Sequence, residues 1–126
     1  MKTDIVLSTL GHTWILDLDG TLLKHNGYII DGEDYLLAGA KEFLASIPDG
    51  DMIVIVTSRD SGQRESTERF LSSMGIRYDA IIFNAPYGER IVINDAKPSG
   101  LAMAHSINLK RDAGLLDLRI ILDPKK

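Results

Sequence analysis

The sequence of 126 residues contains no cysteine, and it also lacks any long apolar run. The first absence excludes disulfide bonds and thiolate metal sites, and it favours a location inside the cell. The second excludes a membrane-spanning helix, which needs roughly 18 or more consecutive apolar residues. Residues 1–10 also lack the basic start and the apolar centre of a signal peptide. We therefore expect a cytoplasmic protein with no membrane partner.

An excess of positive charge is absent as well. The chain has 14 Lys and Arg residues against 18 Asp and Glu residues, for a net charge of -4. Such a chain has no general attraction to nucleic acid, so we expect no nucleic-acid partner and expect local cations or a metal to hold any anionic substrate. With 44% hydrophobic and 25% charged residues, the composition is that of a globular protein. The length suits one compact domain over residues 1–126.

The order of apolar segments predicts an α/β fold. Four β-branched runs have the continuous hydrophobicity of strands covered on both faces: 13–18, 52–56, 80–83 and 91–93. Two segments between them have apolar residues at helical spacing: 33–47 and 60–74. This alternation predicts a three-layer, Rossmann-like parallel sheet with right-handed crossovers and helices on both faces. Segment 118–122 is expected to be a short strand. Segment 101–109 could be a strand or a short helix, with a strand favoured, and segment 4–10 is ambiguous.

Two carboxylates lie where the first predicted strand ends. Asp17 and Asp19 are separated by one residue, so on an extended segment they face the same way, and Gly20 follows at a turn. Paired carboxylates repel each other unless a cation lies between them, which points to a hard ion such as Mg²⁺. The alternative is an ordinary Asp-Gly chain reversal with no ligand.

Polar residues also follow two further predicted strands. Thr57, Ser58 and Arg59 come after the second, and a hydroxyl with free backbone N–H groups there suits a phosphate. Alternatively, Ser58 or Asp60 simply caps the next helix. Asp95 follows the fourth run, and in a parallel sheet it would lie beside Asp17 and complete an oxygen-ligated metal site. By itself, Asp95 could equally be a solvated loop acid.

These three clusters resemble the motifs of the haloacid dehalogenase superfamily. The similarity spans residues 13–99, with the first, second and fourth motifs at Asp17-Leu18-Asp19-Gly20-Thr21, Thr57-Ser58-Arg59 and Asn94-Asp95. In that superfamily, ion pumps usually have threonine at the position of Asp19, and dehalogenases lack this acid. The resemblance therefore implies hydrolysis or transfer of phosphoryl groups.

The resemblance also implies a role for each matching residue. Asp17 would attack phosphorus and form an aspartyl-phosphate, while Asp19 would act as general acid and then as general base. Mg²⁺ would be held by Asp17, the backbone carbonyl of Asp19, and Asp95. The remaining motif residues would surround the phosphate, with Arg59 as a secondary expectation: Gly20, Thr57, Ser58 and Arg59.

The sequence departs from the family pattern at two positions. No lysine lies between residues 84 and 90, where the family has the cation that neutralises the nucleophile and the phosphate. Lys97 is the preferred substitute and Arg90 the other candidate, although either could be a plain surface cation. Asn94 replaces the first acid of the usual acidic pair, which lowers the negative charge of the site.

Short connections leave no room for the lid domain that many relatives have. We therefore expect a capless phosphomonoesterase with an open site, acting on a small sugar or polyol phosphate in surface-carbohydrate synthesis. Either a large substrate or a second copy of the chain in a homo-oligomer would then cover the site. Two alternatives stay open. One is phosphoryl transfer as in mutase-like relatives, and the other is a non-catalytic member that binds a phosphorylated ligand or a protein. The Lys110-Arg111-Asp112 cluster is expected to be a solvated turn.

Overall fold

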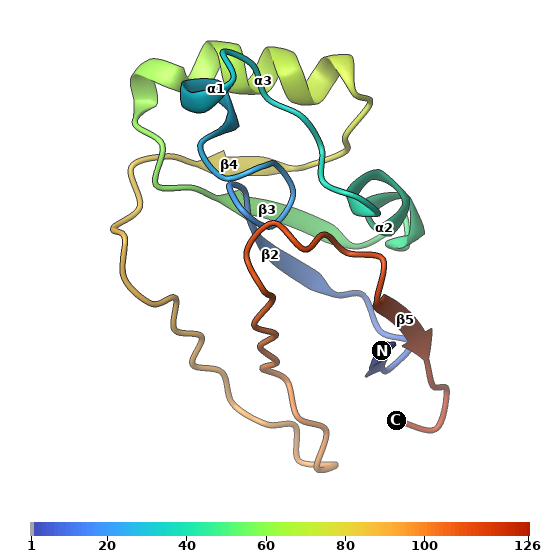
Figure 1. Ribbon diagram of the computed structural model, residues 1–126. Coiled ribbons are helices and arrows are strands. Elements are labelled where there is room, and N and C mark those ends of the chain that lie inside the picture. The colour runs from blue at the N-terminus through green and yellow to red at the C-terminus, as the bar shows by residue number, and fades with distance from the viewer. Residues whose placement is uncertain (1) are drawn as a thin grey trace.

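The computed structural model describes residues 2–126 and has an α/β fold with parallel strands in two small sheets (Figure 1). Along the chain the elements are β1 (Thr3–Leu7), β2 (Thr13–Asp17), α1 (Gly27–Ile30), α2 (Ala40–Ser46), β3 (Met52–Val56), the 3-10 helix η1 (Ser61–Gln63), α3 (Arg64–Ser73), β4 (Ala80–Ile82) and β5 (Leu118–Leu122). None of the helices in this part of the chain has the length and apolar content needed to cross a bilayer.

The larger sheet consists of three of the predicted strands. Its order is β2-β3-β4, and all pairs are parallel. The strand predictions for 13–18, 52–56 and 80–83 are therefore confirmed. Asp17 pairs with Val56 at the last position of the β2–β3 ladder, so the loops after both strands begin at the same edge of the sheet. The sequence motifs at Asp17 and Thr57 are neighbours for this reason.

The smaller sheet joins the two ends of the chain. β1 pairs with β5 in parallel from Thr3–Leu118 to Leu7–Leu122. The ambiguous segment 4–10 is thus largely a strand, and the strand expected at 118–122 is confirmed.

One predicted helix is confirmed and the other is much shorter than expected. The segment 60–74 forms η1 and α3, and the Asp60 carboxylate caps the start by accepting from the Gly62 N–H at 2.7 Å. The prediction for 33–47 is wrong before residue 40. Gly39 has a φ of 80°, and a Cβ there would lie 2.7 Å from the Leu116 backbone nitrogen. This close approach of a distant segment sets the start of α2 at Ala40, which helical spacing cannot reveal.

The helices α2 and α3 cover one face of the larger sheet (Figure 1). Leu44 of α2 and Leu71 of α3 share one apolar core with Ile53 and Ile55 of β3. The opposite face has no helix, and Ile15 and Ile82 there are about half exposed. The expectation of helices on both faces is therefore not met.

The segment 84–117 has no helix or strand, so the strand predicted at 91–93 is wrong, as is the short strand expected at 101–109. It runs as a long coil away from the sheet and back (Figure 1). Ile93 is 92% exposed, because this coil pairs with no strand edge that would bury it. Both ends of the coil are anchored near Asp17: Ala85 N–H donates to the Thr57 carbonyl at 3.0 Å, and Asp112 N–H to the Gly20 carbonyl at 2.9 Å.

Candidate functional site

Asp17 lies at the carboxyl end of β2 with an accessible carboxylate. Its side chain is 42% exposed, and its Oδ2 accepts a hydrogen bond from Thr21 Oγ1 at 3.0 Å. The Nη1 of Arg90 lies 3.4 Å from Asp17 Oδ1. Gly20, with a φ of 87°, turns the chain back, and the turn closes through its N–H to the Leu23 carbonyl at 2.7 Å. The carboxylate is thus fixed between a hydroxyl and a guanidinium while staying open to solvent.

Asp19 is held by Arg59 through a two-bond fork. Arg59 Nε donates to Asp19 Oδ2 at 3.0 Å, and Nη2 donates to Asp19 Oδ1 at 2.8 Å. The same guanidinium binds both carboxylate oxygens of Asp34, at 2.8 and 3.0 Å, and donates to Thr67 Oγ1 at 2.9 Å. Tyr28 lies against it, with the guanidinium carbon 4.2 Å from the ring centroid. Burial acts to lower the pKa of Arg59, but the hydrogen bonds to Asp19 and Asp34 outweigh it and raise that pKa.

The donors of Arg59 are therefore occupied by protein acceptors and are not free for the expected phosphate contact. A guanidinium has five N–H donors, and the two forks and the bond to Thr67 use all of them. With its side chain 2% exposed, Arg59 presents no free donor to a substrate in this conformation. Only the structure could show this, because Asp34 and Thr67 belong to segments with no recognisable motif.

Thr57 and Ser58 follow β3 at the same edge. Thr57 is buried, and its hydroxyl oxygen accepts from the Arg59 N–H at 3.1 Å. The Ser58 hydroxyl donates to the Pro86 carbonyl at 3.2 Å, whereas the Ser58 N–H donates to no acceptor among residues 2–126. The Ser58 N–H is thus free for an anion. The helix cap is Asp60, so one of the two capping alternatives is confirmed.

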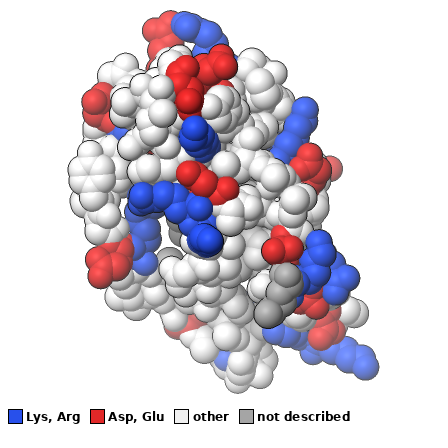
Figure 2. Space-filling model, viewed as in Figure 1, with Lys and Arg blue, Asp and Glu red and all other residues white. Residues whose placement is uncertain are grey.

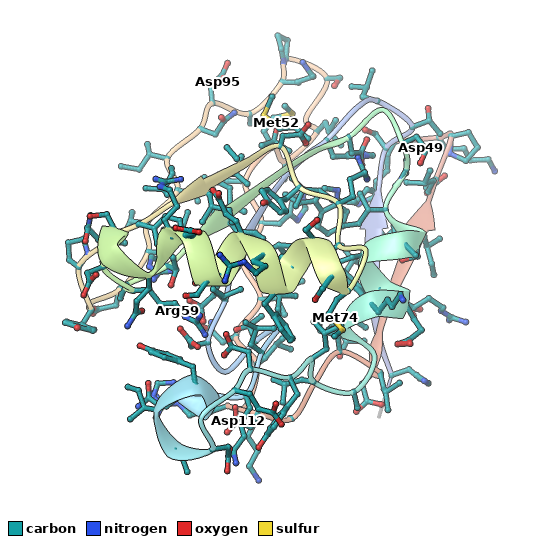
Figure 3. All side chains as sticks on the ribbon, turned by 90° about the horizontal axis from the view of Figure 1, so that it is seen from above. Asp49, Met52, Arg59, Met74, Asp95 and Asp112 are labelled. Atoms are coloured by element: carbon teal, nitrogen blue, oxygen red, sulfur yellow. The ribbon has the colours of Figure 1, made fainter. Side chains whose placement is uncertain are left out.

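Asp95 and Lys97 do not lie with these residues. Both are on the exposed coil that replaces the fourth predicted strand, and Figure 3 shows Asp95 well apart from Arg59. Asn94 Nδ2 donates to the Asp95 carbonyl at 3.0 Å, and the Lys97 ammonium has no partner within the described chain. In the same part of the chain, no three His, Cys, Asp or Glu side chains form a group that could hold a metal ion. The structure therefore brings together Asp17, Asp19, Thr57 and Ser58 and leaves Asp95 and Lys97 outside.

Two residues in contact with the turn at Gly20 were missed by sequence reasoning. The turn at 110–113 is not merely solvated, because Asp112 Oδ1 accepts from the His25 N–H at 2.8 Å and the Arg111 side chain packs over Gly20. The Arg111 guanidinium makes no hydrogen bond or ion pair within residues 2–126. No local pattern indicates this contact, which joins positions about ninety residues apart. On the face of the molecule drawn in Figure 2, basic side chains lie near the middle and acidic side chains lie around them.

The Asp17 carboxylate at this edge is open to solvent, with 42% of its side chain exposed. A hollow of about 400 Å³ lies between α2 and β5, and its lining contains none of the predicted site residues.

No model of a known protein family matches the chain, and no curated protein is similar to it at a significant level. Two solved structures are similar. A chain of the Pnkp1/Rnl/Hen1 complex shares 29% identity over 66% of this chain, with a TM-score of 0.51. A chain of the Pnkp1/Rnl/Hen1 RNA repair complex shares 30% identity over 67%, with a TM-score of 0.52. This chain spans only 31% and 29% of those two chains.

Proposed function

We propose that this chain is a phosphomonoester hydrolase related to the haloacid dehalogenase superfamily, with a capless, Rossmann-like core and Asp17 as nucleophile. The observation that supports this most is the setting of Asp17. Its carboxylate is exposed at the carboxyl edge of a parallel sheet, 3.4 Å from a guanidinium, and a second acid follows two residues later. Ligands of open α/β sheets bind at this edge.

In the proposed reaction, an Asp17 oxygen attacks phosphorus while the bond from phosphorus to the leaving oxygen breaks. Asp19 gives its proton to that oxygen, and the product alcohol departs from an aspartyl-phosphate. Arg90 and the Ser58 N–H stabilise the charge on the phosphoryl oxygens. Water then attacks phosphorus while the bond from phosphorus to the Asp17 oxygen breaks, and Asp19 takes a proton from the water. Inorganic phosphate leaves and the Asp17 carboxylate is restored. Transfer to another alcohol in place of water would make the enzyme a phosphotransferase.

Magnesium stays part of this proposal, although the donors in place do not complete its site. Asp17 and the carbonyl of Asp19 are hard oxygen donors on one turn, whereas Asp95 lies on the coil. A bound ion would offset the repulsion between the Asp17 carboxylate and the phosphate. The coil 84–111 would have to rearrange for Asp95 to bind the ion.

Removal of Mg²⁺ by a chelator should abolish phosphate release from an aryl phosphate, and added Mg²⁺ should restore it. If Asp95 is a ligand, Asp95→Asn should raise the Mg²⁺ concentration needed for half-maximal rate by about tenfold or more. Glu89→Gln, on the same coil, is the matched control and should titrate like the parent protein. An unchanged Mg²⁺ titration in Asp95→Asn would exclude Asp95 from the site.

The contact with Asp17 favours Arg90 over Lys97 as the cation that neutralises nucleophile and phosphate. Replacing Arg90 by alanine should lower kcat/KM about a hundredfold, the typical effect of losing one donor to the reacting oxygens. Lys97→Ala should change kcat/KM less than about twofold, as expected for a surface cation that touches no reacting group. Steady-state kinetics of both variants decide between them, and a larger loss in Lys97→Ala would support the sequence-based preference.

Two substrate classes remain for this reaction. Sugar or polyol phosphates follow from the superfamily resemblance. The terminal phosphate of an RNA strand is the second candidate, because the similar chains belong to an RNA repair complex and the unpaired Arg111 guanidinium lies beside the nucleophile turn. Phosphate release from a panel of sugar phosphates and from 3′- and 5′-phosphorylated oligoribonucleotides separates the two classes. Mg²⁺-dependent binding with no release from any of them would instead favour a non-catalytic binding protein.

A further inference from the structure

The guanidinium of Arg59 binds a second carboxylate, Asp34, which has no part in the reaction described above. Asp34 precedes α2 in the turn-rich segment 31–39, and it accepts from Arg59 Nη2 and Nη1 at 2.8 and 3.0 Å. Asp19 accepts from Nη2 and Nε at 2.8 and 3.0 Å. One planar guanidinium thus holds both carboxylates through two forks that share Nη2 (Figure 3 labels Arg59).

The side chains of this network, which consists of Arg59, Asp19 and Asp34, differ in burial. The Arg59 side chain is 2% exposed, Asp34 is 8% exposed and Asp19 is 17% exposed. Asp34 is therefore the more buried of the two carboxylates. A buried fork–fork arrangement restricts the plane of each carboxylate as well as its distance.

The network also joins three segments that lie apart in the sequence. Asp19 comes from the turn after β2, Arg59 from the turn after β3, and Asp34 from the segment before α2. Thr67 of α3 accepts the one N–H that the carboxylates leave, and Tyr28 covers the guanidinium. Without Asp34, two of the five donors would lose their acceptor, and the guanidinium would be free to tilt away from the plane that now holds Asp19.

We propose that Asp34 is a positioning residue that acts through Arg59 to fix the Asp19 carboxyl for proton transfer to the leaving oxygen. This inference rests on the proposed function, since it concerns the proton donor of that reaction. Asp34 does not touch the substrate. Its contribution is the orientation of the group that does.

Leaving groups of different basicity test this role. A 4-nitrophenolate departs as a stable anion, whereas an alkyl alkoxide needs a proton as its bond to phosphorus breaks. Because kcat/KM covers the steps up to phosphoenzyme formation, it reports proton donation without the later water attack. Asp34→Asn should therefore lower kcat/KM at least about tenfold for an alkyl phosphate and less than about threefold for 4-nitrophenyl phosphate.

The matched control is Asp4→Asn, which weakens another carboxylate fork, to the exposed Arg119 on β5, and should leave both rates unchanged. Asp34→Glu keeps the charge and both oxygens and should restore part of the alkyl rate. An equal loss for both substrates in Asp34→Asn, or no loss, would overturn the inference. If the parent protein hydrolyses neither substrate, the proposed function itself fails. Circular dichroism and thermal unfolding should show that each variant is folded under the conditions of the kinetic assay.

Discussion

Replacement of Asp17 by asparagine should abolish phosphate release, with a loss of at least about a thousandfold in kcat. The amide keeps the shape of the side chain and can still accept from Thr21, but it cannot attack phosphorus as the carboxylate does. Mass spectrometry after rapid acid quench should show a phosphoryl adduct on the Asp17 peptide of the parent protein and none on the variant. Phosphate release from an aryl phosphate measures the loss.

Asp112→Asn is a suitable control for this experiment. Asp112 lies beside the same turn and accepts from the His25 N–H through one oxygen, which an amide oxygen can replace. It should therefore retain most of the activity. If Asp17→Asn kept more than about a tenth of the parent rate, Asp17 would not be the nucleophile.

Replacement of Arg59 by alanine should produce the largest loss of stability among single changes in the site. The substitution leaves Asp19 and Asp34 as neighbouring carboxylates without their shared cation, and breaking a buried ion pair in this way costs about 3–5 kcal/mol. The free energy of unfolding, measured by urea denaturation, should fall by that amount. The midpoint of thermal unfolding should drop by roughly 10 °C or more.

Arg119→Ala provides the comparison for this loss of stability. Arg119 makes a similar fork to Asp4, but its side chain is 64% exposed, and exposed ion pairs contribute less than about 1 kcal/mol. If Arg59→Ala unfolded at the same urea concentration as the parent protein, the buried network would not stabilise the fold. Asp34 could then not fix the orientation of Asp19 through Arg59, because the hydrogen bonds of Arg59 would not hold the two carboxylates in place.

Local patterns predicted the parts of the fold whose residues carry their own signal. Strands β2 and β3 are short, continuous apolar runs, and such runs form strands where a partner strand is available. The segment 60–74 has an apolar stripe and a capping residue, Asp60, which caps η1 directly before α3, so the start of the segment was predicted by one of two candidate residues. The placement of Asp17 and Thr57 at one edge follows from parallel pairing alone.

Other predictions failed because neighbours distant in sequence decide the outcome. The apolar residues of segment 33–39 have helical spacing, yet α2 begins only at Ala40, because Gly39 lies against the backbone at Leu116. The run 91–93 has strand composition, but it leaves the sheet and stays exposed. A strand needs an edge to pair with, and composition does not show whether that edge is within reach.

The sequence alone determined the chemical groups available to this protein: two acids and a glycine after β2, two hydroxyls after β3, and no lysine between residues 84 and 90. The tertiary structure decided their partners. It buried Arg59 between Asp19 and Asp34, put Arg90 against Asp17, and packed Arg111 over Gly20. Side-chain partnerships of this kind depend on where loops meet in space, and loops far apart in sequence carry no periodic signal of each other.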